Sequence, residues 1–179
     1  MTDKKEVTFK NLAKHTHEVL LGMSHRDSLT GLLNRRGYDE KFNEYYQRAQ
    51  RNKDRFQIIF IDLDKFKQIN TKYHHTGGDE ALKAAGEAIR KTFREIDAKA
   101  RYGGDEFAVL TLDIRKTKEL PVQDFSACLN RNLNDLRPSF MQPDELRATV
   151  GLIKWDGRET REELFQRVDK MMMSKKENG

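Results

Sequence analysis

Two short acidic stretches contain the residues whose types and spacing could do chemistry. Asp62 and Asp64 flank Leu63 at the end of an apolar run. Asp105 and Glu106 directly follow a pair of glycines. Carboxylates held at close range repel each other, and a hard divalent cation bound by carboxylate and backbone oxygens relieves that repulsion. If the fold brings the two stretches together, the four carboxylates would converge and a cation such as Mg²⁺, which binds beside substrate phosphates, would fit between them.

The two glycines before Asp105 have two interpretations. Gly103 and Gly104 join two apolar segments, and Gly-Gly is favoured in two-residue hairpin turns, where both residues can need a positive φ. Glycine also lets the backbone approach a phosphate closely, because it has no β-carbon. The glycines alone are explained by a hairpin turn. The acids on both sides of Leu63 shift the interpretation toward a turn that binds a nucleotide.

The apolar pattern predicts the elements that must position these acids. Strands are expected at 56–64, at 98–113 on both sides of the glycines, and at 146–155. Helices are expected around Tyr38 to Ala49, from about Asp79 to Arg94 after a polar loop, after Pro121, and over 160–176, where Thr160 and Glu163 have capping-box spacing. The core order β-α-β-β-α-β predicts a ferredoxin-like α+β fold, a mostly antiparallel sheet with flanking helices packed on one face. In that topology the first strand lies beside the central hairpin.

The composition narrows the class of protein. The chain has 179 residues, a net charge of +5 and one cysteine, Cys128, which excludes an internal disulfide and fits a reducing compartment. Its longest apolar run, from Ile58 to Ile61, is far too short to span a membrane, so we expect a cytoplasmic domain whose parent protein can still be membrane-anchored. Lys and Arg are dispersed among acids, which argues against nucleic-acid binding.

The chain divides into two parts. Residues 1–25 show the apolar spacing of an amphipathic or coiled-coil helix, and residues 26–179 form the domain proper. The first part is either a helix docked on its own domain or a signalling and dimerisation linker from a larger sensor protein. Both interpretations stay open.

Three motifs resemble those of the GGDEF family of diguanylate cyclases, which condense two GTP molecules into cyclic di-GMP. They are DSLTGLLNRR, IDLDKFKQIN and RYGGDEF, and the resemblance runs from about Asp27 to Gly179. Several motifs in the right order are far more specific than one short pattern. The resemblance implies phosphoryl transfer assisted by Mg²⁺ or Mn²⁺ in a homodimer, with one GTP bound by each subunit.

The family motifs also imply roles for the acids. Asp62 and Asp105 match metal-binding carboxylates, and Leu63 matches a backbone carbonyl ligand. Glu106 matches either the base for the attacking 3′-hydroxyl or a further metal contact, and both roles stay open. Gly103 and Gly104 belong to the same catalytic turn.

The implied GTP-binding positions come from three segments. They are Lys65, Phe66, Lys67, Asn70, Asp79 and Lys176. Asn70 and Asp79 match the pair that reads guanine, which suits a carboxylate because guanine presents two adjacent donors. Taken alone, Asp79 could instead cap its helix.

Arg94 and Asp97 match the family's RxxD inhibitory site, at which product binds. The alternative is an exposed ion pair at a helix end, worth roughly 0.3 kcal/mol. The chain also departs from the family at Thr71 and His74, which stand where the family usually has Asp and Gly. A second functional hypothesis is a receptor module that binds cyclic di-GMP or GTP without catalysis.

Overall fold

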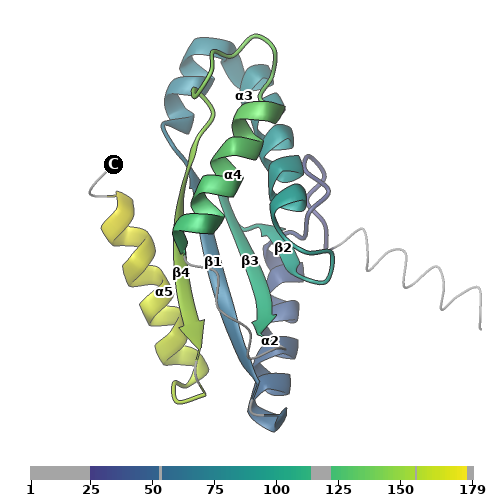
Figure 1. Cartoon of the computed structure of the whole chain (residues 1–179), viewed down its shortest axis with the longest axis vertical. Helices are drawn as coiled ribbons and strands as arrows, with labels where there is room; N and C mark the ends of the chain where they lie inside the picture. The colour runs from purple at the N-terminus through teal and green to yellow at the C-terminus, as the bar shows by residue number, and fades with distance from the viewer. Residues whose placement is uncertain (1–24, 53, 114–121, 156, 177–179) are drawn as a thin grey trace, which may run out of the picture.

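The computed structural model describes residues 25–52, 54–113, 122–155 and 157–176 (Figure 1). Its strands form one antiparallel sheet in the order β2-β3-β1-β4. They are β1 (Arg55–Leu63), β2 (Ala98–Arg101), β3 (Glu106–Asp113) and β4 (Ala148–Trp155). With α3 (Phe66–Thr92) after β1 and α4 (Val122–Leu136) after β3, the ferredoxin-like α+β fold is confirmed. The helix predicted for residues 1–25 lies, except for its last residue, outside the described residues.

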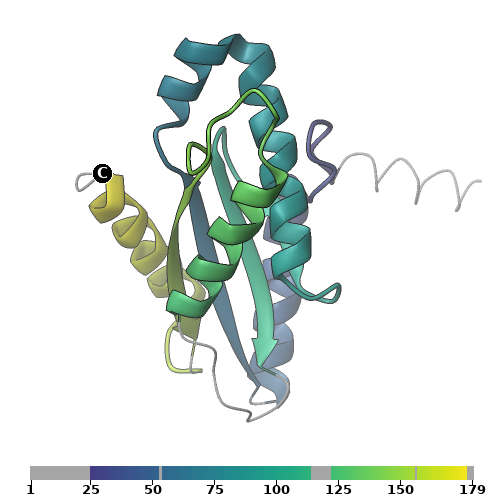
Figure 2. The same ribbon diagram turned by 45° about the horizontal axis from the view of Figure 1, so that its top comes forward.

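Helices cover both faces of the sheet. The core helices α3 and α4 pack on one face, as predicted, whereas α2 (Arg35–Asn52) and α5 (Arg161–Lys176) pack on the other (Figures 1 and 2). The expectation of one helical face concerned the β-α-β-β-α-β core and is confirmed, whereas α2 and α5 lie outside that core. The reason that both faces are covered is in β1, where Ile59 and Ile61 join one buried cluster while Ile58 and Phe60 join the other. A strand with two apolar faces has to be covered on both.

The largest difference from the sequence-based prediction is in α3. Residues expected to form a polar loop before Asp79 are helical from Phe66 onward, and the helix is broken only at His74, with φ 59° and ψ 178°. We call residues 66–73 the first arm of α3 and residues 75–92 the second arm. Ile69 is the one fully buried side chain of the first arm, so most of this short segment faces solvent. Its sequence therefore resembles that of a polar loop. Figure 2 shows the bend beyond the end of the sheet.

The glycine pair does not form the expected two-residue turn. The connection between β2 and β3 comprises residues 102–105, and the N–H groups of Tyr102 and Gly103 both donate to the Glu106 carbonyl, at 2.8 and 3.1 Å. Neither Gly103 nor Gly104 has a positive φ, so that part of the prediction was wrong.

The start of α5 and the lengths of the helices test two further expectations. The capping box at the start of α5 is confirmed, since Glu163 N–H donates to Thr160 Oγ1 at 3.2 Å and Thr160 N–H donates to Glu163 Oε2 at 2.8 Å. Over the ranges given above, no helix is both long and apolar enough to cross a membrane.

Candidate catalytic and nucleotide-binding site

The acidic stretches meet at one end of the sheet. Asp62 pairs with Glu106 across the β1/β3 ladder and with Thr149 across the β1/β4 ladder. Directly opposite residues of an antiparallel pair have their β-carbons roughly 5 Å apart and on the same face. The side chains of Asp62 and Glu106 therefore belong to one half-buried row at the sheet end.

Asp105 reaches this end through the backbone. The Leu63 N–H donates to the Asp105 carbonyl at 3.2 Å, which continues the β1/β3 ladder by one step into the turn. Asp64, in contrast, does not face the turn as expected. Its Oδ1 accepts a hydrogen bond from the Thr149 hydroxyl at 2.7 Å, on the β4 side of β1. The expected convergence of four carboxylates is therefore wrong with respect to Asp64.

The acidic sheet end offers few oxygen donors for a metal ion. Within the residues that the structure describes, no group of three or more His, Cys, Asp or Glu side chains is arranged to hold a metal ion. The set implied by the sequence has two carboxylates, Asp62 and Asp105, and the Leu63 carbonyl. These are hard oxygen donors, few in number, at a sheet end directly before a helix N-terminus. The donor set fits Mg²⁺ or Mn²⁺, which keep water or substrate oxygens in their remaining positions.

The two glycines of the turn serve different purposes. A β-carbon at Gly103 would lie 2.6 Å from Glu106 Oε2, so the absence of one makes room for the Glu106 carboxylate. A β-carbon at Gly104 would meet nothing within 4 Å. Among the residues that the structure describes, no packing requires glycine at Gly104, and the open space beside it suits the close approach of a ligand.

Arg101 fixes the turn from behind. Its Nε and Nη2 donate to the Gly104 carbonyl at 3.0 and 2.8 Å, and its Nη1 donates to Asp27 Oδ2 at 3.2 Å. Burial alone would raise the pKa of Asp27, but the hydrogen bonds from Thr30 and the charge of Arg101 outweigh it and hold that pKa below its ordinary value. Asp27 is thus a charged anchor that connects the DSLTGLLNRR motif to the glycine turn.

The N-terminus of α3 follows β1 almost at once. Lys65 occupies the N-cap position in a left-handed conformation, φ 55° and ψ 30°, and makes no side-chain capping bond. The first turn contains no acidic residue, and Lys67 is exposed there. Backbone N–H groups at such a helix end favour an anion. Lys65, Phe66 and Lys67 therefore lie where the resemblance implies a phosphate cradle.

The two guanine-reading candidates lie on either side of the bend. Asn70 is on the first arm, and its side chain lies against Gly78, where a β-carbon would be 2.0 Å from Asn70 Oδ1. Asp79 is the next residue on the second arm and is exposed. Because Asp79 lies inside α3 and not at its N-cap, the capping interpretation is wrong. The bend brings Asn70 beside the chain segment that carries Asp79.

Lys176 is the last residue of α5, and its side chain is outside what the structure describes. Figures 1 and 2 show α5 running along the sheet toward the end at which β1 leaves and α3 begins. The C-terminal end of α5 therefore lies on the side of the molecule that carries the acidic row.

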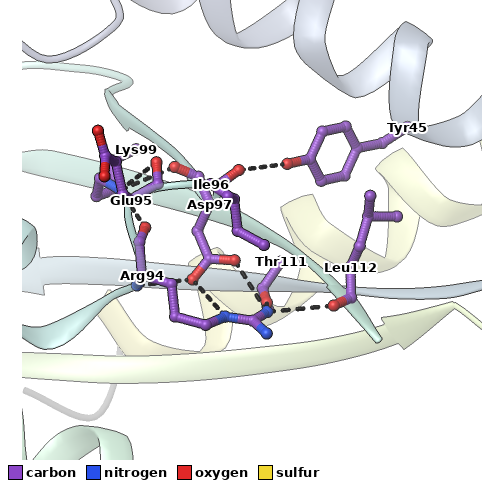
Figure 3. A network of polar contacts seen from close by, with 8 residues as sticks. All are labelled: Tyr45, Arg94, Glu95, Ile96, Asp97, Lys99, Thr111 and Leu112. Carbon is purple, nitrogen blue, oxygen red and sulfur yellow. Dashed lines mark hydrogen bonds and ion pairs between the residues drawn. The ribbon is translucent and has the colours of Figure 1, made fainter. Parts of the chain in front are cut away.

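The RxxD pair forms a closed network (Figure 3). Asp97 accepts from Arg94 Nη2 at 3.0 Å, Nε at 3.3 Å and backbone N–H at 2.9 Å, and Arg94 Nη2 also donates to Thr111 and to the Leu112 carbonyl. The Asp97 side chain is 3% exposed and that of Arg94 57%. An exposed ion pair at a helix end is therefore the wrong description. Asp97 orients Arg94, which presents its guanidinium to solvent.

The turn that carries this pair is held from two further sides. Lys99 Nζ donates to the carbonyls of Glu95 and Asp97, at 3.3 and 2.9 Å, and the Tyr45 hydroxyl donates to the Ile96 carbonyl at 3.0 Å (Figure 3). A hollow of about 500 Å³ adjoins the turn, and Ile96, 62% exposed, lies at it. The turn that carries Arg94 and Asp97 is therefore bonded to α2 through Tyr45 and to β2 through Lys99.

The fold and the acidic sheet end define a domain of the nucleotidyl-cyclase-like α+β class. The family model described as "Diguanylate cyclase, GGDEF domain" matches residues 24–179. The chain therefore belongs to the GGDEF domain family of diguanylate cyclases.

The similar proteins include diguanylate cyclases and a cyclic di-GMP phosphodiesterase. Diguanylate cyclase DgcS of Shewanella oneidensis is 45% identical over 84 residues, which cover 47% of this chain and 28% of that protein. Cyclic di-GMP phosphodiesterase NbdA of Pseudomonas aeruginosa is 41% identical over 100 residues, 56% of this chain and 13% of that protein. The crystal structure of diguanylate cyclase SiaD in complex with its activator SiaC, from P. aeruginosa, superposes with a TM-score of 0.72 at 27% identity, covering 99% of this chain and 67% of that one. The chain spans less than a third of the length of either curated relative.

Sequence reasoning missed four residues that lie in or next to the site: Asp27, Arg101, Glu145 and Thr149. Arg101 and Asp27 stand in recognised motifs, but no local pattern shows that residues this far apart in sequence touch. Thr149 occupies an ordinary strand position, and only the β1/β4 register places it opposite Asp62. Glu145 lies in the loop before β4, whose sequence, with two prolines and a mixture of polar and apolar residues, shows no regular pattern.

Proposed function

We propose that this chain is a diguanylate cyclase domain that condenses two GTP molecules into cyclic di-GMP and two pyrophosphates. One observation carries the proposal. The Asp62–Glu106 register pair and the Leu63–Asp105 hydrogen bond lie directly before an uncapped helix N-terminus that starts with Lys65. Carboxylates for cations and free N–H groups for phosphates are thus combined at one end of the sheet.

In the proposed site, Asp62, Asp105 and the Leu63 carbonyl would hold Mg²⁺ or Mn²⁺. When bound, such a cation neutralises triphosphate charge and favours ionisation of a coordinated hydroxyl. The backbone N–H groups at Lys65 and Phe66 and the charge of Lys67 orient the terminal phosphates. Lys176 adds a second cation from the end of α5. Glu106, for which Gly103 leaves room, either accepts the 3′-hydroxyl proton or contacts the metal.

Guanine selectivity rests on Asp79 and Asn70. A carboxylate only accepts hydrogen bonds, so Asp79 can pair with the two adjacent donors of guanine but meets an acceptor on the corresponding edge of adenine. Its exposed position inside α3, beside the contact of Asn70 with Gly78, supports this role over helix capping. The proposed substrate is therefore GTP and not ATP.

The reaction requires two copies of the domain, because each GTP supplies the 3′-hydroxyl that attacks the α-phosphate of the other. Each copy carries one acidic row and one glycine turn, so turnover should depend on a face-to-face homodimer. We further propose that the product inhibits by binding Arg94, whose half-exposed guanidinium Asp97 holds in place. In the parent protein an upstream sensor or regulatory domain would control the dimer.

The alternative is a receptor that binds cyclic di-GMP at Arg94 and Asp97 without catalysis, and two substitutions separate the proposals. If the domain is an enzyme, Asp105→Ala abolishes formation of cyclic di-GMP, whereas Arg94→Ala retains turnover and loses inhibition by added product. If it is a receptor, the wild type forms no product and only Arg94→Ala lowers affinity for cyclic di-GMP.

Lys99→Met is the control for Arg94→Ala, because it loosens the same turn without removing the guanidinium. If Lys99→Met relieves inhibition equally, the integrity of the turn and not Arg94 is responsible.

A further inference from the structure

The bend of α3 is supported from the side by the α4–β4 loop, residues 137–147. Both ribbon views show this loop extending to the bend (Figures 1 and 2). Glu145 of the loop accepts hydrogen bonds from Lys72 Nζ at 2.7 Å and from the Tyr73 hydroxyl at 2.7 Å. Its Oε2 also accepts from the Gln142 backbone N–H at 2.9 Å. One carboxylate therefore joins the end of the first arm to the loop, and the loop's own turn holds that carboxylate in position.

An aromatic contact closes the same junction. The rings of Tyr73 and Phe140 are 5.0 Å apart, and Lys72 Nζ lies 4.8 Å from the centroid of the Tyr73 ring. A β-carbon at Gly77 would lie 2.4 Å from the Tyr73 β-carbon and 3.5 Å from the Phe140 ring. Tyr73 is thus packed between the loop and the start of the second arm. The junction has contacts on both sides of the bend.

The two arms carry different parts of the proposed GTP site. Lys67 and Asn70 lie on the first arm, and Asp79 lies on the second. Between them, the backbone of His74 has a positive φ that side chains other than glycine rarely adopt, so local backbone preference does not favour this bend angle. Contacts outside the helix must therefore help to maintain the angle. Glu145 provides the polar contacts that reach the first arm from the loop.

We propose that Glu145 is a positioning residue for nucleotide binding: by holding the first arm through Lys72 and Tyr73, it sets the spacing of Asn70 and Asp79 on which guanine recognition depends. This proposal rests on the proposed function. It does not place Glu145 in contact with GTP. Loss of Glu145 should therefore weaken GTP binding and leave the chemical step nearly unchanged.

Two variants test this on the whole chain. Glu145→Ala removes both contacts to the first arm, whereas Tyr73→Phe removes only the hydroxyl and keeps the ring between Phe140 and Gly77. Steady-state kinetics with GTP and Mg²⁺ should show KM raised roughly five- to tenfold in Glu145→Ala and about two- to threefold in Tyr73→Phe, with kcat within about twofold of wild type. Titration with a non-hydrolysable GTP analogue should show the same loss of affinity. Tyr73→Phe keeps the test valid if Glu145→Ala does not fold.

Glu163→Ala is the matched control. Glu163 also bonds a backbone N–H and a hydroxyl, but at the start of α5, so its loss should lower the melting temperature without changing KM. Suppose that the wild type binds and converts GTP. If Glu145→Ala and Tyr73→Phe then leave KM unchanged, or reduce kcat alone, only the positioning role is overturned. A wild type that neither binds the analogue nor makes product overturns the proposed function and this inference together.

Discussion

Asp62 stands opposite Glu106 in the antiparallel β1/β3 ladder, and the next step of that ladder joins Leu63 to Asp105. Like charges opposite each other oppose folding unless a cation or a donor faces them. The pair lies at the sheet end, where β1 passes into the start of α3, the proposed position of the phosphates. In the proposed function, this relationship places the acids beside the bound nucleotide.

The carboxylates should differ in importance according to the direction in which they point. Asp62→Asn or Asp105→Asn should lower kcat for cyclic di-GMP formation by on the order of 100-fold or more, because each removes a proposed metal ligand. Asp64→Asn is the matched control from the same motif. Asp64 bonds Thr149 on the β4 side, so its replacement should cost less than about tenfold. Equal losses for Asp62→Asn and Asp64→Asn would contradict the assignment, and melting curves check that all three variants fold.

Asp79 should determine which nucleotide base the site binds. Asp79→Asn replaces an acceptor-only group by one that also donates, so KM for GTP should rise by roughly 10- to 100-fold, the cost of one or two charge-assisted hydrogen bonds. Glu80→Ala changes the neighbouring carboxylate, which pairs with Lys83, and should leave KM for GTP unchanged. Competition between GTP and ATP measures the selectivity directly. If Asp79→Asn keeps the wild-type preference for GTP, base recognition lies elsewhere.

His74 should be a strained residue. Its φ of 59° and ψ of 178° place it in a region populated almost only by glycine, at a cost of about 1–3 kcal/mol. His74→Gly should therefore raise the free energy of unfolding by about 1 kcal/mol in urea denaturation. His75→Gly, one residue further and in ordinary helical geometry, should lower it by about 1 kcal/mol. The same sign for both substitutions would show that the backbone of His74 is not strained.

The Glu145 contacts should make stability depend on pH. Hydrogen bonds from Lys72 and Tyr73 lower the pKa of Glu145 to about 2 in the folded chain. A carboxylate with a depressed folded pKa stabilises the protein above its unfolded pKa and loses that effect as the pH falls toward the folded pKa. The stability difference between wild type and Glu145→Gln should thus be largest above pH 5, about 1 kcal/mol because Lys72 is solvent-exposed, and should shrink steadily toward pH 3. Urea denaturation across that range measures it, and a difference that grows with acidity would contradict the contact.

Much of the fold could be predicted from local patterns. A strand with apolar residues on both faces, such as Ile58 to Ile61, has to be central, and the element order then places Asp62 near Glu106. The capping box of Thr160 and Glu163 predicted the start of α5 because both partners lie within one turn. The capping box depends on neighbours in sequence, and the approach of Asp62 to Glu106 depends on the order of the elements, both of which a sequence displays.

What could not be predicted depends on contacts between distant segments. The first arm of α3 is short, and it is held by the packing of Gly77 and Gly78 against Tyr73 and Asn70, contacts across the bend that the sequence does not show. The spacing of Asp62 and Asp64 predicts that both side chains point toward the glycine turn. Instead, the Asp64 carboxylate accepts a hydrogen bond from the Thr149 hydroxyl on the β4 side of β1. The contact between Asp27 and Arg101 joins two motifs that no local spacing relates.

The central claim is tested most directly by identifying the product made from GTP. The whole chain is incubated with GTP and Mg²⁺ at rising protein concentration, and again with the domains held together as an enforced dimer, and the products are identified by mass spectrometry. The proposed function predicts cyclic di-GMP and pyrophosphate, at a rate per subunit that rises with concentration and is highest in the enforced dimer. Absence of cyclic di-GMP from the enforced dimer, under conditions in which the chain binds GTP, would contradict it.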